Sequence, residues 1–138
     1  MAELKRFGYG LQALVVLATV PGQYSSAEIA EQIHCEPTAL RKILSRLTEA
    51  GYIKVRQGRG GGYSLACYPG EITLAEVYLS LHDDIPMLDG MLDTTGNHLF
   101  GHKVRQSFDR IMTDIRAQVE HVLKSYTLAD LVEQRQTE

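Results

Sequence analysis

The chain has 138 residues, of which 44% are hydrophobic and 22% charged, and its formal net charge is −3. This composition is typical of one globular domain with an extension, and it excludes a disordered polymer and a protein dominated by membrane-spanning segments. A secretory leader needs a basic start, an apolar run and a small-residue cleavage site. The sequence has no such leader, so we expect a cytoplasmic protein without a membrane partner.

Two helices are predicted in the first third of the chain. The first comes before Pro21 and Gly22, and its apolar residues at helical spacing are Phe7, Leu11, Leu14, Val15 and Ala18. The second begins near Ser25 and Glu28, which are spaced as in a capping box, where a hydroxyl and a carboxylate accept hydrogen bonds from free backbone N–H groups. Its apolar residues are Ala27, Ile29, Ala30 and Ile33.

A third helix is predicted from about Pro37 to Ala50. Proline suits the first position of a helix because its φ is already fixed, and Gly51 can end the helix in the left-handed conformation. One face is apolar and should pack, with Leu40, Ile43, Leu44 and Leu47. Another face is polar and free to contact a partner, with Thr38, Arg41, Lys42 and Ser45.

Two short strands follow at residues 52–56 and 63–66, joined by the glycine-rich segment 57–62. Glycines adopt the positive φ angles that tight hairpins need, and they let the backbone approach a phosphate without a Cβ in the way. Two helices joined by a tight turn and followed by a glycine-tipped hairpin predict a winged helix-turn-helix.

The charge of the chain is unevenly distributed. Residues 36–62 hold six basic and two acidic side chains, a local charge of +4 in a chain whose total is −3. A basic surface on an acidic protein attracts a polyanion to one place and in one orientation. Charged helices are often merely solvated, but the agreement of caps, turn and hairpin favours double-stranded DNA as the partner.

The chain changes character after the hairpin. Thr73 and Glu76 form a second capping-box pattern at the start of another helix. Residues 83–98 are rich in Asp, Gly and Thr, and we predict an irregular loop there that either connects two elements or lines an effector pocket. The proposed division is therefore a DNA-binding domain (1–82), a loop (83–98), and a dimerisation helix followed by a short helix (99–138).

A long apolar stripe marks the last third of the chain. Its residues recur every three or four positions over about 30 Å of helix, more than a small winged-helix core needs. We therefore predict a homodimer interface, although the stripe could instead pack on its own domain. The predicted interface residues are Val104, Phe108, Ile111, Met112, Ile115, Val119 and Val122.

The sequence resembles the Rrf2 family of bacterial transcription regulators. The resemblance is strongest over residues 40–65, where a Leu-rich helix, the turn Gly51-Tyr52-Ile53 and the run Gly-Gly-Gly-Tyr-Ser-Leu at 60–65 match the family pattern. Segments 7–14, 71–77 and 127–131 extend it over nearly the whole chain. The resemblance implies a mainly α-helical fold with a small β-hairpin, DNA binding by a winged helix-turn-helix, and dimerisation through a long C-terminal helix.

Two departures from the family bear on the DNA-binding residues. Members commonly carry Arg-Gly-Pro at the wing tip, whereas this chain has Gln57 at the Arg position and Arg59 at the Pro position. Arg41 stands where many members have Glu, which implies a changed base preference. The residues we expect at the DNA are Ser26, Thr38, Arg41, Lys42, Ser45, Arg56, Gln57, Arg59, Gly60 and Gly61.

The cysteine content argues against a bound metal. Iron–sulfur members of the family have three closely spaced cysteines before the long helix, and residues 83–103 contain none. Cys35 and Cys67 are the only cysteines, so we expect no metal and no cofactor. These two thiols are either a redox switch beside the DNA-contacting elements or small buried hydrophobic residues.

No catalytic arrangement is recognisable, and we expect no enzyme. The sequence predicts a dimeric, sequence-specific DNA-binding transcriptional regulator, a repressor that responds to a small effector or to thiol oxidation. The alternative is a dimeric interaction scaffold without DNA binding, or a metal-dependent sensor.

Overall fold

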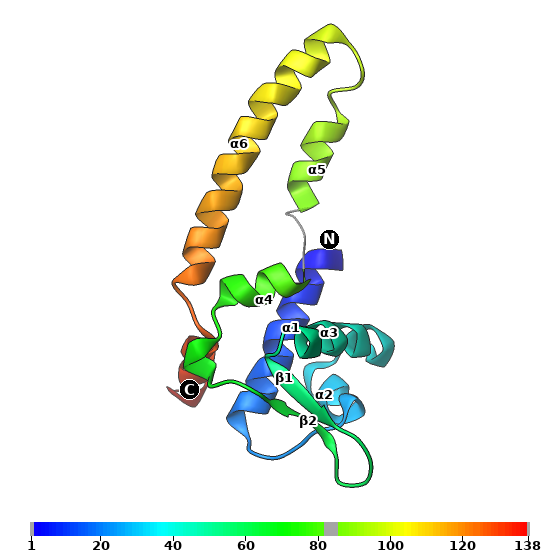
Figure 1. Cartoon of the computed structure of the whole chain (residues 1–138), viewed down its shortest axis with the longest axis vertical. Helices are drawn as coiled ribbons and strands as arrows, with labels where there is room; N and C mark the ends of the chain where they lie inside the picture. Colours follow the sequence, from blue (N-terminus) through cyan, green and yellow to red (C-terminus); the bar gives the residue numbers. More distant parts are fainter. Residues whose placement is uncertain (1, 82–85, 138) are drawn as a thin grey trace.

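A computed structural model describes residues 2–81 and 86–137. It consists of a winged-helix body, shown in the lower half of Figure 1, and a long helical arm that rises from it. The elements follow in chain order: α1 (Ala2–Thr19), α2 (Ser26–Ile33), α3 (Pro37–Glu49), β1 (Ile53–Arg56), β2 (Gly62–Leu65), the 3-10 helix η1 (Pro69–Glu71), α4 (Leu74–Leu81), α5 (Pro86–Asp93), α6 (Leu99–Lys124) and α7 (Leu128–Thr137).

The helix boundaries of the body are those that the local sequence predicts. Ser25 Oγ accepts from the Glu28 N–H at 3.1 Å, and the Ser25 N–H donates to Glu28 Oε1 at 3.0 Å, so the capping box is confirmed. Helix α3 begins at Pro37, and Gly51 follows its last turn with φ +89°. These contacts span three or four residues, which is why the sequence alone reveals them.

The hairpin is antiparallel, with Ile53 opposite Leu65 and Arg56 opposite Gly62. A Cβ on Gly61 would collide with the Arg56 carbonyl oxygen, so only glycine fits there. On the other side, Tyr63 N–H donates to the Tyr24 carbonyl at 2.7 Å and Tyr24 N–H donates to the Tyr63 carbonyl at 3.1 Å. The hairpin is thus fixed to the segment before α2, and the wing projects from an anchored base.

The core lies where α1 crosses the other helices of the body. Its largest fully buried side chains come from α1, α2, α3, β1 and α4 and from Ile72, and α7 returns from the end of the chain to close it. These residues include Leu14, Ile29, Leu40, Leu44, Leu47, Ile53, Ile72, Val77, Leu81 and Leu128. Gly10 allows this packing, because a Cβ there would lie 2.6 Å from Leu81 Cδ1.

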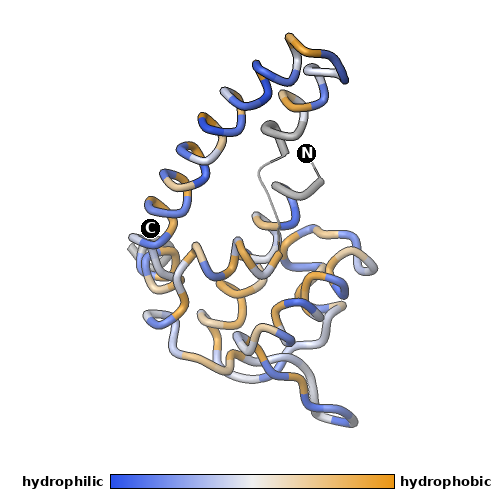
Figure 2. Tube along the Cα trace, turned by 45° about the horizontal axis from the view of Figure 1, so that its top comes forward, coloured by the Kyte–Doolittle hydropathy of each residue, from blue (hydrophilic) through white to orange (hydrophobic). Residues whose placement is uncertain are grey.

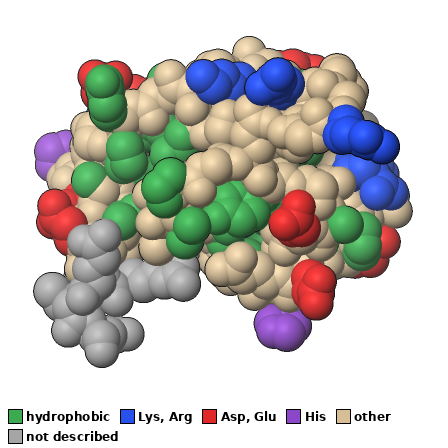
Figure 3. Space-filling view, turned by 90° about the horizontal axis from the view of Figure 1, so that it is seen from below, with side chains coloured by type: hydrophobic (Ala, Val, Ile, Leu, Met, Phe, Trp, Pro, Cys, Tyr) green, Lys and Arg blue, Asp and Glu red, His purple; other side chains and the backbone are tan. Residues whose placement is uncertain are grey.

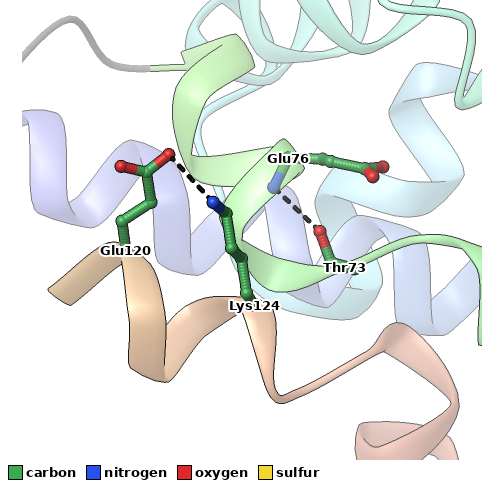
Figure 4. Close-up of polar contacts among 4 residues, drawn as sticks. All are labelled: Thr73, Glu76, Glu120 and Lys124. Atoms are coloured by element: carbon green, nitrogen blue, oxygen red, sulfur yellow. Dashed lines mark hydrogen bonds and ion pairs between the residues drawn. The ribbon is translucent and has the colours of Figure 1, made fainter. Parts of the chain in front are cut away.

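Helices α5 and α6 run antiparallel and form the arm (Figure 1). At the tip, His98 caps α6, with Nδ1 accepting from the Gly101 N–H at 3.0 Å. At the base, the Leu74 N–H donates to the Tyr126 carbonyl at 3.0 Å, which joins the start of α4 to the end of α6. Figure 4 shows this junction, where Thr73 caps α4 through the Glu76 N–H at 3.2 Å. Within α6, Lys124 forms an ion pair with Glu120, one turn earlier, at 3.7 Å.

The predicted irregular loop at 83–98 is wrong over part of its length, because α5 occupies Pro86–Asp93. Proline at the first helical position starts the helix, and α6 packs beside it, so tertiary contact outweighs the turn-forming composition. Only the connection after Asp93 is irregular, while residues 82–85 lie outside the described part of the chain.

The hydropathy of the two parts differs. In Figure 2 the hydrophobic stretches of the body lie in its interior, whereas α6 alternates between hydrophilic and hydrophobic residues along an extended rod. Met112 is fully buried within the single chain, so its assignment to a dimer interface is wrong. It occupies the side of α6 turned toward its own fold. No helix among the described residues is long and apolar enough to cross a membrane.

Candidate nucleic-acid interface

Helix α3 is held by an N-cap that the sequence analysis did not identify. The Glu36 carboxylate accepts from the Thr38 N–H at 3.0 Å and from the Ala39 N–H at 2.8 Å. These backbone hydrogen bonds hold the pKa of the Glu36 carboxyl below its ordinary value. Glutamate is a less common N-cap than Ser, Thr, Asp or Asn. The only feature of the sequence that could have indicated this cap was the position of Glu36 directly before Pro37. The cap fixes the start of the helix that carries the candidate DNA-reading residues.

The two faces of α3 differ as predicted. Its apolar residues Leu40, Ile43, Leu44 and Leu47 are buried against the body. Its polar residues Thr38, Arg41, Lys42 and Ser45 are all exposed. Arg41 Nη2 donates to Thr38 Oγ1 at 3.3 Å, which orients the guanidinium group across one turn of the helix. The exposed face therefore offers hydrogen-bond donors and two positive charges on a rigid, well-packed helix.

The wing carries the second set of predicted contacts. Arg59 is exposed at the tip, between Gly58 with φ +88° and Gly60 with φ +76°. The Gly61 N–H donates to the Gly58 carbonyl at 3.1 Å and closes the turn beneath it. Arg56 is also exposed, at the end of β1. The wing thus presents one arginine at its tip and one where β1 enters the tip loop.

Four other residues that we expect at the DNA lie outside the exposed face of α3 and the two wing arginines. Gln57 and Gly60 are exposed on the wing, and Gly61 is half-buried in its turn. Ser26 is the first residue of α2 and is half-buried, next to the capping residue Ser25. Figure 3 shows the molecule from below, where Lys and Arg side chains gather along the upper and right-hand rim of the face.

Two arginines from separate helices meet at the end of α4. Arg6 Nη1 donates to the Leu81 carbonyl at 3.3 Å, and Arg46 Nη1 donates to the same oxygen at 3.2 Å. Cations favour a helix C-terminus, where the backbone carbonyls carry partial negative charge. This contact joins α1, α3 and α4 at the point where the chain leaves the body. Sequence analysis missed it because the three residues are far apart in the chain.

The structure separates the two cysteines. Cys35 precedes α3 and is 7% exposed, and burial, followed by the nearby charge of Glu36, raises the pKa of its thiol. Cys67 is half-buried, and its Sγ donates to the Gly51 carbonyl at 3.4 Å, beyond the other end of α3. A helix of 13 residues is about 20 Å long, so the thiols of one chain are too far apart for a disulfide.

Helix α6 exposes much of its apolar stripe. Ile111 is 49% exposed and Val122 is 52% exposed. The remaining stripe residues, Val104, Phe108, Ile115 and Val119, are half-buried. At the tip of the arm, Leu99 and Phe100 are 73% and 74% exposed. A single chain therefore leaves an apolar surface open along the arm.

Comparison with known proteins identifies the relatives of this chain. The Rrf2 family, described as iron-dependent transcriptional regulators, matches residues 4–134. The HTH-type transcriptional regulator NsrR of Bacillus subtilis (strain 168) is 31% identical over 130 residues, which are 93% of this chain and 88% of that protein. These matches confirm the resemblance found in the sequence.

Solved structures agree with this assignment. IscR of T. potens is 28% identical and superposes with a TM-score of 0.69, covering 94% of this chain and 85% of that chain. CymR (YrzC), the global cysteine regulator of B. subtilis, is 27% identical with a TM-score of 0.67, and the match covers 94% of each chain. The predicted fold class, mainly helical with a small hairpin, is confirmed.

The description of the family as iron-dependent raises the question of a metal site. No group of three or more His, Cys, Asp or Glu side chains that could hold a metal occurs within 2–81 and 86–137. The two cysteines lie at opposite ends of α3, and segment 83–103 has none. An iron–sulfur cluster needs about four thiolate or equivalent ligands. The described residues therefore do not fit a cluster bound by one chain.

Proposed function

The chain belongs to the Rrf2 family of transcriptional regulators, and we propose that it acts as a homodimer whose two α3 helices and wings bind one two-fold symmetric DNA site. The family confirms the DNA-binding regulatory function expected from the sequence. The dimer, the individual contact residues and repression belong to the proposal. We also expect no enzymatic activity, because regulation by DNA binding requires none.

One observation carries the proposal: the exposed polar face of α3 lies on a helix whose opposite face is completely buried. Leu40, Leu44 and Leu47 are 0% exposed, so the reading face is held rigidly by the core. A helix of this kind fits the major groove, where its side chains reach the base edges. The wing follows α3 in the chain, and in this proposal Arg59 at its tip enters the adjacent minor groove.

The homodimer follows from the open surface of the arm. Ile111 and Val122 are exposed on one side of α6, and such a stripe is stabilised when a second copy covers it. A two-fold dimer reads two half-sites about one helical turn apart, or a multiple of that distance. Doubling the site gives a regulator the selectivity that a single helix-turn-helix lacks.

We propose repression as the regulatory outcome, since a bound dimer blocks a promoter that it overlaps without contacting any other protein. For the signal, we favour a small effector over oxidation of Cys35. The Cys35 side chain is buried and the pKa of its thiol is raised, and both properties disfavour the reactive thiolate. Oxidation at Cys67, which is half-buried, is the remaining thiol route.

The test is binding to DNA sites selected from a random pool, measured over a range of salt concentrations. We expect Arg41→Ala to relax the preference at one position, at a cost of about 1–3 kcal/mol, because a side chain that contacts a base edge sets the sequence preference there. Lys42→Ala should weaken all sequences equally, as the loss of a phosphate contact does. If the wild-type chain selects no sequence and binds without salt dependence, the proposed function is wrong.

A further inference from the structure

A groove of about 510 Å³ lies between the N-terminal part of α1 and one side of α3. Lys5, Arg6 and Tyr9 line it from α1, and Thr38, Lys42 and Arg46 line it from α3. The three α3 residues are four positions apart, so they form one row along the helix. Thr38 and Lys42 also belong to the exposed reading face, and the groove therefore adjoins that face on the side of α1.

Four of these side chains are cations. Lys5, Lys42 and Arg46 are exposed and Arg6 is half-buried. Arg6 and Arg46 each use Nη1 to bind the Leu81 carbonyl, which fixes their guanidinium groups within reach of the groove. A guanidinium group has five N–H donors, so each arginine keeps others for a ligand. The arginines are thus pre-oriented, while the lysines extend from the two walls.

The lining includes one carboxylate, that of Glu36. Its two oxygens already accept from the Thr38 and Ala39 N–H groups, and these bonds hold it at the end of α3. The described lining residues therefore place four cations around a single anion that is occupied as a helix cap. Like charges that line one groove repel one another, and an added anion relieves that repulsion.

We propose that this groove binds a phosphate group of the DNA backbone, beside the major groove that α3 enters. The inference rests on the proposed function. The major groove is about 12 Å wide and a helix with its side chains is about 10 Å wide, so phosphates on the rim lie against the sides of the helix. Lys42 and Arg46 lie on that side, and Lys5 of α1 extends the contact. The DNA interface thus includes α1, outside the helix-turn-helix and the wing.

The central test is Lys5→Ala in the full-length chain, with Lys103→Ala on the arm as the matched loss of one exposed lysine. We expect Lys5→Ala to lower affinity about three- to tenfold in low salt, by the same factor on every sequence, and to reduce the salt slope by about one. Lys103→Ala should change neither quantity. Equal effects of the two variants would show that Lys5 acts only through net charge, which overturns the proposal.

Neutral methylphosphonate, substituted for one phosphate at a time in a selected duplex, identifies the contact. Lys5→Ala should lose affinity on every duplex except the one that lacks its phosphate, where wild type and variant should bind equally. If no position removes the difference, the groove does not hold a backbone phosphate. A wild-type chain that binds no duplex at all would instead contradict the proposed function.

A free phosphate compound is the other source of the same chemical group. Pyrophosphate should compete with DNA no better than sulfate at equal ionic strength. The reason is that the proposed ligand is a phosphate of the duplex backbone, which the rest of the DNA interface holds against the protein. Specific competition by pyrophosphate that disappears in Lys5→Ala, with DNA affinity unchanged by that substitution, would overturn the proposal and assign the groove to a small anion.

Discussion

The winged-helix body and the helical arm differ in how far their apolar side chains are buried within one chain. The body buries its large aliphatic side chains within one chain, with α1 in the centre and α7 closing the core. In the arm, α6 has 26 residues, and its buried residues are Gly101 and Met112. The body therefore covers its apolar side chains by its own packing, whereas a single chain leaves part of the apolar stripe of α6 exposed.

Under the proposed function, this difference assigns DNA binding to the body and dimerisation to the arm. A rigid body suits DNA reading, because side chains on α3 must keep fixed positions relative to the bases. An open arm suits assembly, since dimerisation sets the spacing of two such bodies. Leu81 ends the last helix of the body before the arm, and its carbonyl accepts from Arg6 and Arg46.

The largest effect is expected from Ile111→Glu in the arm. Ile111 is 49% exposed in the single chain, so the variant should fold, but a charge at this position opposes burial by a second copy. We expect a monomer by sedimentation and a DNA affinity at least about 100-fold lower, because the two half-sites are no longer linked. Gln106→Glu, on the opposite side of α6, should stay dimeric. If Ile111→Glu keeps the wild-type mass, the stripe is not the interface.

In the body, Leu44→Ala should lower the free energy of unfolding by about 2–5 kcal/mol, because the removed side chain leaves a cavity in a closed core. Leu44 is 0% exposed, whereas Leu99 at the tip of the arm is 73% exposed. Leu99→Ala should therefore change stability by less than about 0.5 kcal/mol. Denaturant unfolding measures both variants. Similar losses would mean that the tip is also packed, against a second copy.

A smaller effect is expected at the wing, which is the part of the body that projects away from its core. Arg59→Ala should cost affinity on an operator with A·T-rich flanks about threefold more than on one with G·C-rich flanks, since the narrow minor groove of A·T tracts is more negative. Arg56→Ala should lower the affinity equally on both operators, because Arg56 lies at the end of β1, where we expect it to contact the phosphate backbone of the DNA. If Arg59→Ala loses the same affinity on both operators, Arg59 contacts only a phosphate.

The smallest effect concerns the cap of α3. Hydrogen bonds from the Thr38 and Ala39 N–H groups lower the pKa of the Glu36 carboxyl. The charged Glu36 cap therefore stabilises the folded chain fully above the ordinary carboxyl pKa of about 4.3. This stabilisation is lost as the pH falls through the lower pKa of the folded state. Glu36→Gln should flatten this part of the stability profile below pH 5. An unchanged profile would show that the cap contributes nothing to acid sensitivity.

The sequence by itself determined the elements of the body. Ser25 with Glu28, Pro37 and Gly51 act over three or four residues, so their spacing alone places two helices and the turn between them. The glycines of the wing are equally readable, because a Cβ at Gly61 would collide with a backbone atom five residues away. The same local periodicity revealed the long stripe of α6.

Only the tertiary structure decided which of these residues meet. Lys5 and Arg46 line one groove, although 40 other residues separate them in the chain, and no local pattern predicts that approach. Packing made α5 a helix within a segment of turn-forming composition, and it placed Met112 inside its own subunit. It also set Cys35 and Cys67 at opposite ends of α3. Short-range hydrogen bonds and periodicity are recorded in neighbouring residues, whereas burial and long-range charge clusters depend on how the helices pack.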